Sequence, residues 1–231
     1  MNNLTNALKI LHGKNNETVE KHRNRFSKLK EICTQKFGDL DLHYFSTPGR
    51  TEIGGNHTDH NHGRVLAGSV DLDSIAVAAK NNENRVVLHS EGYNTSFVID
   101  LSQLAAVQEE QETTYALIRG IAARFKQLGY ETGGFNACMC SDVLPGSGLS
   151  SSASVEVLIG SIFNALYNNS SIAPEELAKI GQYAENEYFG KPCGLMDQMA
   201  CAVGGIIAID FKDPQKPIVE KVDFDFAAQH Y

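Results

Sequence analysis

Three segments of the sequence combine residue types that could carry out chemistry. The first, PGSGLSSSA at residues 145–153, lies between a strand-like segment and a helical pattern. Gly146 and Gly148 allow the positive φ angles and close backbone approach that a ligand-binding turn needs. Three serine hydroxyls then meet the unpaired N–H groups of a helix N-terminus, a combination suited to a triphosphate. A serine-capped helix after a flexible turn is the alternative that this segment leaves open.

The second segment, GRTEIGGNHTDHNHG at residues 49–63, follows the first expected strand and reads as a glycine-hinged polar loop. It gathers a guanidinium, a carboxylate and three imidazoles, which belong to Arg50, Asp59, His57, His60 and His62. Burying so many polar groups is costly unless each finds a partner. Three interpretations are open: a site that hydrogen-bonds sugar hydroxyls, a zinc site made by the histidines with Asp59, and a solvated surface loop.

The third segment, AENEYFGKPCGLMDQ at residues 184–198, places two carboxylates on either side of a turn. Glu185 lies in a helical pattern and Asp197 follows twelve residues later, with glycines and a proline between them. A helix–loop–helix in which Asp197 serves near an N-cap would explain the same residues.

Taken together, the three segments resemble motifs of the GHMP kinase superfamily, and of the galactokinase family in particular. Residues 145–153 match the superfamily's phosphate-binding motif, which ends in G-L-S-S-S-A. Residues 184–198 align without a gap with A-E-H-x-x-x-G-x-P-C-G-I-M-D-Q, with Asn186 in place of the histidine. The galactokinase signature G-R-V-N-L-I-G-E-H-T-D-Y-N-G-G is matched at Gly49, Arg50, Gly55, His57, Thr58, Asp59, Asn61 and Gly63.

The signature also shows departures. The family's glutamate is Asn56 here, its asparagine is Glu52 and its tyrosine is His60. An amide can donate as well as accept hydrogen bonds, and a buried polar mismatch costs about 1–3 kcal/mol. The change at Asn56 therefore predicts weaker discrimination for galactose, or a preference for another aldose.

The resemblance implies a role for each matched residue. Asp197 would be the catalytic carboxylate, with Arg50 beside it and beside the reacting hydroxyl. Ser152 and Glu185 would hold Mg²⁺, whereas Cys193 would be structural. The implied sugar-binding residues are Asn56, His57, Asp59 and Gly194. The implied ATP-binding residues are Pro145, Gly146, Ser147, Gly148, Leu149, Ser150, Ser151, Ser152 and Ala153.

The elements that must position these residues are strands in groups separated by helices, which predicts an α+β class. Helices are expected over residues 17–37 and 114–128, near residue 150 and from Pro174. Strands are expected over residues 42–48, 134–142 and 206–210 and in the tail VEKVDFDF, and residues 74–79, 85–90 and 94–100 read as an antiparallel run. The resemblance implies a two-layer mixed sheet with helices, the N-terminal domain of GHMP kinases, which is ribosomal S5 domain 2-like.

The expected organisation is an N-terminal helical lead-in over residues 1–36, followed by a GHMP-type domain that binds ATP and sugar over residues 37–231. The third glycine-rich motif, which the family carries in its C-terminal domain, is not found in the sequence. We therefore expect that domain to be absent, and residues 1–231 alone to have negligible kinase activity and an exposed apolar patch.

The bulk composition limits the partners. A net charge of −8 argues against binding of a nucleic-acid backbone, and 42% hydrophobic residues are ordinary for a globular protein. No signal peptide and no apolar run long enough to span a bilayer is visible. Five cysteines without a C-x-x-C pair favour a reducing cytoplasm. The sequence does not specify an oligomeric state.

These observations predict an ATP- and Mg²⁺-dependent phosphotransferase that acts on a sugar hydroxyl, most simply converting galactose to galactose 1-phosphate. A related GHMP kinase with another sugar substrate, a non-catalytic sensor of sugar and ATP, and a histidine-based metal-binding module are the alternatives.

Overall fold

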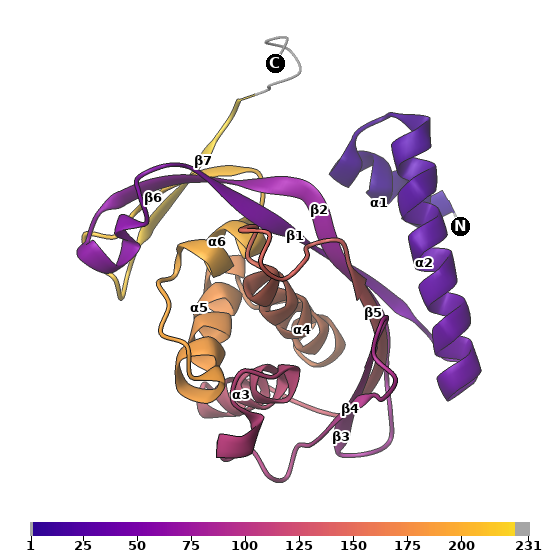
Figure 1. Cartoon of the computed structure of the whole chain (residues 1–231). Coiled ribbons are helices and arrows are strands. Elements are labelled where there is room, and N and C mark those ends of the chain that lie inside the picture. The colour runs from indigo at the N-terminus through magenta and orange to yellow at the C-terminus, as the bar shows by residue number, and fades with distance from the viewer. Residues whose placement is uncertain (1, 225–231) are drawn as a thin grey trace.

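The computed structural model describes residues 2–224, and for residues 2 and 3 only the backbone. The chain folds as one mixed sheet with helices on both of its faces (Figure 1). The strands are β1 (His43–Gly54), β2 (Arg64–Lys80), β3 (Arg85–Ser90), β4 (Phe97–Asp100), β5 (Phe135–Ser141), β6 (Ile206–Asp210) and β7 (Ile218–Val222). The helices are α1 (Asn2–His12), α2 (Asn16–Phe37), α3 (Thr114–Gln127), α4 (Ser151–Tyr167), α5 (Pro174–Ala184) and α6 (Met196–Val203), with short helical turns at Thr58–Asn61 (η1), Gln108–Glu110 (η2) and Glu185–Phe189 (η3).

The strand order is β4-β3-β5-β2-β6-β7, and β1 pairs with the other edge of β2. Strand β2 is the centre of the sheet, because its first half pairs with β6, its second half pairs with β5, and β1 runs antiparallel along most of its length. All pairs are antiparallel except β3 with β5. The predicted α+β class and mixed sheet are thereby confirmed.

The main core lies between the sheet and helices α3, α4 and α5, which the sheet curls around (Figure 1). Three aromatic rings form its centre: Phe163 of α4 lies 5.1 Å from Phe135 of β5 and 5.4 Å from Phe125 of α3, measured between ring centroids. All three side chains are fully buried. Helix α4 begins at the serines of the predicted phosphate-binding motif, residues 150–152, so this packing fixes the direction in which they point.

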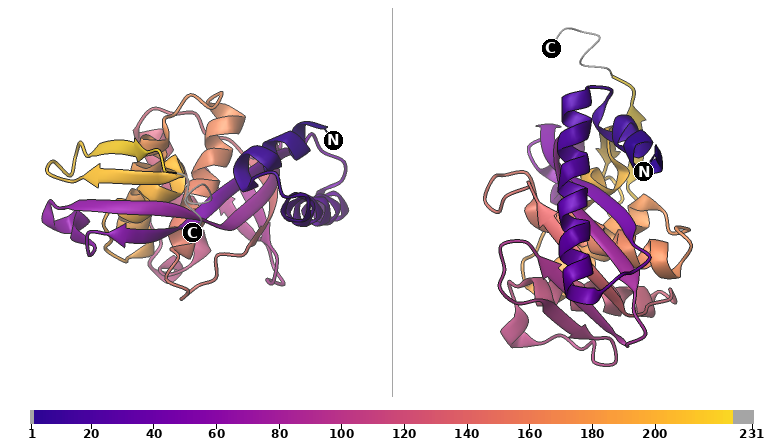
Figure 2. Two further views of the ribbon diagram at one scale, coloured as in Figure 1. Left: turned by 90° about the horizontal axis from the view of Figure 1, so that it is seen from above. Right: turned by 90° about the vertical axis from the view of Figure 1, so that its right-hand side faces the viewer.

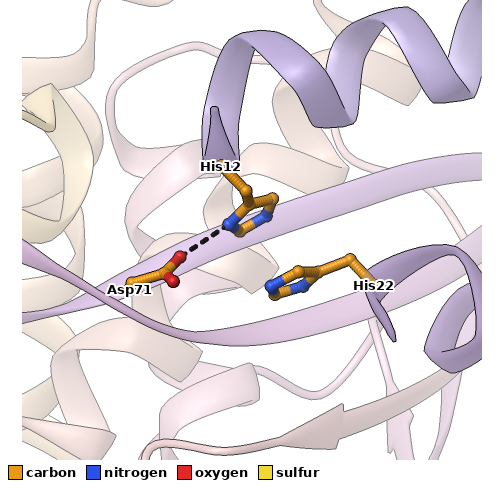
Figure 3. Close-up of side chains that lie close together, drawn as sticks. All are labelled: His12, His22 and Asp71. Carbon is orange, nitrogen blue, oxygen red and sulfur yellow. Dashed lines mark hydrogen bonds and ion pairs between the residues drawn. The ribbon is translucent and has the colours of Figure 1, made fainter. Parts of the chain in front are cut away.

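The opposite face of the sheet is covered by α2, as the views in Figure 2 show. Alternate residues of β2 point to opposite faces. Ala76 and Ala78 join the main core, whereas Ile75 and Val77 pack against α2. The N-terminal lead-in therefore shares a core with the sheet. Helix α1 packs against α2, and His12 at its end lies beside His22 and Asp71 of β2 (Figure 3).

The expected antiparallel run over residues 74–100 is wrong in one respect. Strands β3 and β4 do pair in antiparallel fashion, but β5 lies between β2 and β3 and runs parallel to β3. Parallel neighbours need a crossover connection, and α3 supplies it. The side chains of β5 are buried or half-buried on both faces of the sheet, which is consistent with its central place.

Two further boundaries differ from expectation. The polar segment 49–63 is only partly a loop, because β1 continues to Gly54 and β2 already begins at Arg64. Register shifts near Arg50 and Glu52 allow these polar residues to remain in the hairpin. Strand β7 ends at Val222, and residues 225–226 of the expected tail strand lie outside the described residues.

Candidate active site

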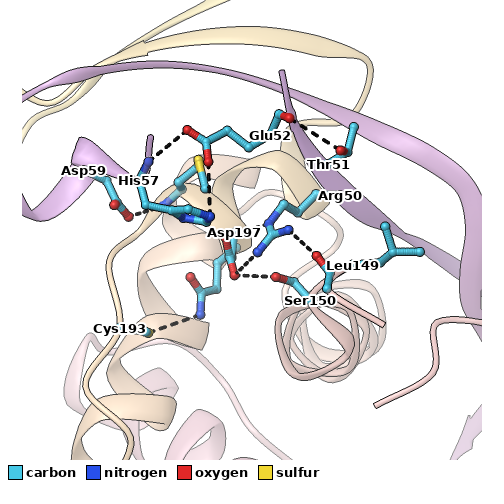
Figure 4. Close-up of polar contacts among 12 residues, drawn as sticks. Arg50, Thr51, Glu52, His57, Asp59, Leu149, Ser150, Cys193 and Asp197 are labelled. Carbon is cyan, nitrogen blue, oxygen red and sulfur yellow. Dashed lines mark hydrogen bonds and ion pairs between the residues drawn. The ribbon is translucent and has the colours of Figure 1, made fainter. Parts of the chain in front are cut away.

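Arg50 and Asp197 form the centre of the site. Arg50 belongs to β1, and Asp197 is the second residue of α6. The guanidinium donates two parallel hydrogen bonds to the carboxylate, from Nε to Oδ1 at 2.6 Å and from Nη2 to Oδ2 at 2.7 Å (Figure 4). This forked geometry is the strongest form of such a pair. The contact between Arg50 and Asp197 that the two motifs predict is present.

The surroundings keep Asp197 ionised. Burial alone would raise the pKa of Asp197, but hydrogen bonds from Arg50 and Ser150, together with the charge of Arg50, outweigh burial and lower it below its ordinary value. Burial likewise opposes the charge of Arg50, whereas Asp197 raises the pKa of that guanidinium. A carboxylate held in its charged form, with 30% of its side chain exposed, can accept a proton from a bound hydroxyl.

The phosphate loop is tied to this pair through its backbone and one hydroxyl. Gly148 O accepts from Arg50 Nη1 at 2.7 Å, and Leu149 O accepts from the Arg50 backbone N–H at 3.1 Å. Gly146 and Gly148 have positive φ angles of 76° and 77°, as their sequence positions suggest. Ser150, at the N-cap of α4, also adopts a left-handed conformation with φ of 58°.

The serine-capped helix that the sequence left open is not what forms. The Ser150 hydroxyl donates to Asp197 Oδ2, and the Ser150 side chain makes no capping hydrogen bond at the N-terminus of α4. The first N–H groups of a helix need partners. At the start of α4 those groups remain available for an anion, and the helix dipole favours negative charge there.

A cavity of about 420 Å³ lies in front of the same helix start. Pro145, Ser151 and Ser152 of the predicted ATP-binding set line it, together with aromatic side chains that include Tyr93 and Phe189. An apolar pocket that opens onto a row of helix N–H groups can accommodate a group with an apolar ring and an attached phosphate chain. The remaining loop residues, Ser147 and Ala153, complete the turn and the first turn of α4.

Ser152 and Glu185 lie together, as the predicted Mg²⁺ site requires. The Ser152 hydroxyl donates to Glu185 Oε1 at 3.0 Å, and the residue Glu185 is 2% exposed. Hard oxygen donors of this kind suit Mg²⁺. Lys191 Nζ lies 3.9 Å from the same oxygen.

Two residues of this site were not among those predicted. Gln198 Nε2 donates to both Glu185 Oε2 and Glu156 Oε2, at 2.8 and 3.0 Å. Burial, and then the charge of Glu185, raise the pKa of Glu156 well above its ordinary value. Glu156 Oε1 is buried without a hydrogen-bond partner among the described residues. Its place one helical turn after Ser152 was the available signal for Glu156, and Gln198 is the last matched residue of the family motif at residues 184–198.

Cys193 is placed by the turn that follows η3. Its backbone N–H donates to Asn186 Oδ1 at 2.7 Å, and Gln182 donates to its carbonyl oxygen at 3.2 Å. Burial raises the pKa of the Cys193 thiol, which disfavours the reactive thiolate. These contacts agree with a structural role for the turn, and Asn186 contributes to it at the position where the family motif has histidine.

Asp59 offers an unused carboxylate oxygen beside the centre. It lies in η1 and is 6% exposed, and its Oδ2 accepts from the backbone N–H of Met196 at 3.2 Å. Its Oδ1 has no hydrogen-bond partner among the described residues and lies 3.5 Å from His60 Nδ1. A buried acceptor without a donor is costly. A ligand hydroxyl would satisfy it.

Gly194 makes the approach of Asp59 possible. A Cβ atom at position 194 would lie 1.7 Å from Asp59 Oδ2, so Gly194→Ala must displace that carboxylate. We expect this substitution to weaken sugar binding at least about tenfold, the effect of losing one hydrogen bond to a charged group, with nucleotide affinity unchanged. Titration calorimetry with sugar and with ATP measures both affinities.

Gly160→Ala is the matched control, because a Cβ there meets only Leu177 at 3.6 Å. Sugar binding equally weak in both variants, or unchanged in Gly194→Ala, would contradict the assignment of Asp59.

The rest of the η1 segment is organised by Glu52. Its carboxylate accepts from the His57 backbone N–H at 2.9 Å and lies 3.1 Å from His57 Nε2 (Figure 4). Asn56 and His57 are exposed residues with left-handed φ angles of 54° and 51°. Glu52 was noted in the sequence only as a departure from the motif, yet it places a carboxylate next to His57.

The zinc interpretation of this segment is not supported by the geometry. His57 faces Glu52, His60 faces Asp59, and His62 Nδ1 lies 3.4 Å from the carbonyl oxygen of Lys212. Within residues 2–224, the trio of possible metal ligands that converges is a different one.

Comparison with known protein families finds matches over two ranges of the chain, and these ranges contain the three segments that form the site. Residues 34–80 match the family described as the galactokinase galactose-binding signature, and residues 116–205 match the N-terminal domain of GHMP kinases. Every predicted site residue lies within one of these two ranges. Among the helices of residues 2–224, none combines the length and the apolar character that a membrane span requires.

Curated relatives and solved structures agree with these matches. The galactokinase of Clostridium tetani is 32% identical over 178 residues, which cover 77% of this chain and 45% of that protein, and the galactokinase of Bacillus subtilis is 34% identical over 76% of this chain and 45% of its own length. The crystal structure of Lactococcus lactis galactokinase complexed with galactose superposes with a TM-score of 0.78 at 31% identity, covering 87% of this chain and 52% of that one. Methanococcus jannaschii mevalonate kinase shares the fold, with a TM-score of 0.65 at 20% identity.

The mixed sheet, the glycine-containing loop at the start of α4 and these matches place the chain in the GHMP kinase superfamily. Within that superfamily it belongs to the galactokinase family, as the sequence motifs predict. The chain spans about half the length of the curated relatives it matches.

Proposed function

We propose that this chain forms the ATP- and sugar-binding part of a galactokinase, which transfers the terminal phosphoryl group of ATP to the anomeric hydroxyl of galactose. The observation that carries the proposal is the forked Arg50–Asp197 pair, which lies against the uncapped phosphate loop. Phosphoryl transfer depends mainly on positioning and on stabilisation of charge. The pair supplies an ionised carboxylate and a fixed cation at one point.

Asp197 is assigned the acceptor of the hydroxyl proton, because Arg50 and Ser150 hold its carboxylate in the ionised form. Arg50 is assigned two roles: it orients Asp197, and it stabilises negative charge on the phosphoryl group that is transferred. Its guanidinium is already fixed by Gly148 O and by Asp197, so little reorganisation is needed when charge develops.

The phosphate chain of ATP is assigned to residues 145–153 and the start of α4, and the adjoining cavity of about 420 Å³ is assigned to the remainder of the nucleotide. Ser152 and Glu185 would hold Mg²⁺, which when bound neutralises phosphate charge. Gln198 holds Glu185 in place by donating to its Oε2, so that Oε1 of Glu185 remains directed at Ser152.

The sugar is assigned to the η1 segment. Asp59 offers its unpaired Oδ1 to a hydroxyl, Gly194 provides the space that Asp59 occupies, and His57 and Asn56 lie at the exposed rim. A related kinase with another aldose substrate is the second candidate, and Glu52 favours it. Its carboxylate is held by His57, whereas position 56 carries an amide.

All five cysteines are free thiols, which suits the cytoplasmic location that we propose.

The test is to incubate the full-length gene product with ATP and each of a panel of aldoses. Phosphorylation is measured as the rate at which ADP is released. We expect turnover with galactose, but weaker discrimination against its epimers than galactokinases of the family show. Asn56→Glu should improve that discrimination by about tenfold, because about 1.4 kcal/mol lies within the range of one polar mismatch. Asn82→Glu, at an exposed asparagine between β2 and β3, is the matched control.

Ordinary efficiency with strict galactose preference would contradict the specificity expected from Asn56. Binding of ATP and sugar without any phosphorylation would contradict the kinase assignment and favour a sensor.

A further inference from the structure

A second group of polar side chains lies away from Arg50 and Asp197, where the N-terminal helices meet the sheet. His12 is the last residue of α1, His22 lies in α2 and Asp71 lies in β2 (Figure 3). One possible ligand atom from each residue lies within 4.8 Å of the other two. Three elements that are far apart in sequence thus bring two imidazoles and one carboxylate together.

The group is buried at one end and open at the other. The side chain of His12 is 6% exposed and the residue His22 is 2% exposed, whereas the side chain of Asp71 is 69% exposed. A cavity of about 570 Å³, lined in part by His12, Asp71 and Asp73, adjoins the group. An ion could therefore reach the buried imidazoles past Asp71.

One nitrogen of the group has no partner. His12 Nδ1 is hydrogen-bonded to Asp71 Oδ1 at 2.8 Å, but His12 Nε2 is buried without a hydrogen-bond partner among the described residues. A carboxylate oxygen, Asp73 Oδ2, lies 3.9 Å from this nitrogen. A buried polar atom without a partner is unusual in a folded protein and calls for an explanation.

We propose that His12, His22 and Asp71 form a binding site for a divalent transition-metal ion, with Zn²⁺ as the ion best suited to two imidazoles and one carboxylate. Water completes the coordination on the exposed side of Asp71. Asp71 and Asp73 together carry two negative charges, whereas the neighbouring Arg25 carries one positive charge. This local excess of negative charge favours the binding of a cation.

The proposal accounts for the unpaired nitrogen of His12. A metal ion bound at Nδ1 requires the ring proton to be on Nε2, which then donates toward Asp73. Metal-bound histidines almost always donate their other ring N–H to a carboxylate, a carbonyl group or water. Asp73 is fixed for this purpose, because Ser46 donates to its Oδ2 at 2.6 Å and Arg25 donates to its Oδ1.

Binding requires a small rearrangement. Zn²⁺ ligands lie about 2.0–2.2 Å from the ion, so the three atoms must come closer than 4.8 Å and the stacked rings of His12 and His22 must tilt. The exposed Asp71 side chain and His12, at the end of its helix, are the two ligands free to move. The imidazole of His22 must also turn away from Arg25 and lose the 3.1 Å contact between its Nδ1 and Arg25 Nη1. Arg25 retains Asp73 and Asp142 as partners.

The experiment is titration of the metal-free 231-residue chain with Zn²⁺ by calorimetry, and with Co²⁺ by visible absorption. We expect one ion per chain, a cobalt spectrum without the thiolate bands that cysteine ligands would produce, and slower amide exchange in α1 when the ion is bound. Asp71→Asn and His12→Gln should lose this binding. His43→Gln, an exposed histidine of β1, is the control and should bind normally.

Asp73→Asn provides a separate test, because it removes the carboxylate that faces His12 Nε2 but no ligand. Loss of such a partner weakens metal affinity by about 10–100-fold. Zn²⁺ binding that is absent, or that survives Asp71→Asn and His12→Gln unchanged, would overturn the site. Because Asp71 is exposed, Asp71→Asn should remain folded, and circular dichroism would verify that.

Discussion

The full-length gene product with Asp197→Asn should lose phosphoryl transfer by about 10²–10⁴-fold in kcat, the usual contribution of a general base. The amide has nearly the same shape and its oxygen can still accept from Arg50, but it cannot take a proton. The KM for galactose and the affinity for ATP should therefore change little. Steady-state kinetics with a coupled ADP assay measures kcat and KM separately.

Asp41→Asn is the control for Asp197→Asn, because Asp41 is exposed and lies outside the site. A variant that keeps wild-type kcat would show that Asp197 only positions Arg50. A rise in KM for the sugar with kcat unchanged would instead show that Asp197 binds the sugar equally well in the ground state and in the transition state.

Arg50→Met should destabilise the fold by about 3 kcal/mol, the lower end for a buried pair that loses one partner, because Asp197 keeps 30% of its side chain exposed. The sign of the pH dependence should also reverse. In the wild type the lowered pKa of Asp197 stabilises the fold above the ordinary aspartate pKa of about 3.9, and this contribution is lost as pH falls through the folded-state pKa.

In Arg50→Met, burial acts on Asp197 without the guanidinium that opposes it, so the folded-state pKa should rise above the unfolded value. Asp197 then contributes a destabilisation that grows as pH rises between those two values. Urea unfolding across acidic and neutral pH measures this slope. Arg50→Lys should retain the wild-type sign while losing most activity, and Arg85→Met, at an exposed arginine, should stay within about 0.5 kcal/mol of wild type. An unchanged slope in Arg50→Met would contradict the assignment of the pKa to the pair.

Local elements were predictable from the sequence where a strong local signal exists. The paired glycines before IIAID predicted β6, and the proline and acidic residues at the start of α5 predicted that helix. Strand order was less accessible, because the insertion of β5 beside β3 depends on which strands bury both faces in the assembled sheet. Local alternation is the same for an edge strand and a central one.

The site shows the same division. Spacing alone could not bring Arg50 and Asp197 together, since they are 147 residues apart, and only the resemblance to a family predicted their contact. Ser150 was identified as a loop residue, but periodicity does not reveal that its hydroxyl turns to Asp197 instead of capping α4. The function of Glu52 was missed for a similar reason, because a carboxylate on a strand gives no local sign of the backbone N–H it will accept from.

The central place of β2 has a consequence for synthesis on the ribosome. Its first half has β6 as a neighbour, and residues 64–68 must wait for residues 206–210 to emerge before that edge of the sheet can close. At about 5–20 residues per second, the interval is on the order of 10–30 s. During that time the edge exposes unpaired backbone groups of the kind that recruit foreign strands. Nascent chains that stall before β6 should therefore be the species most dependent on chaperones and most prone to aggregate.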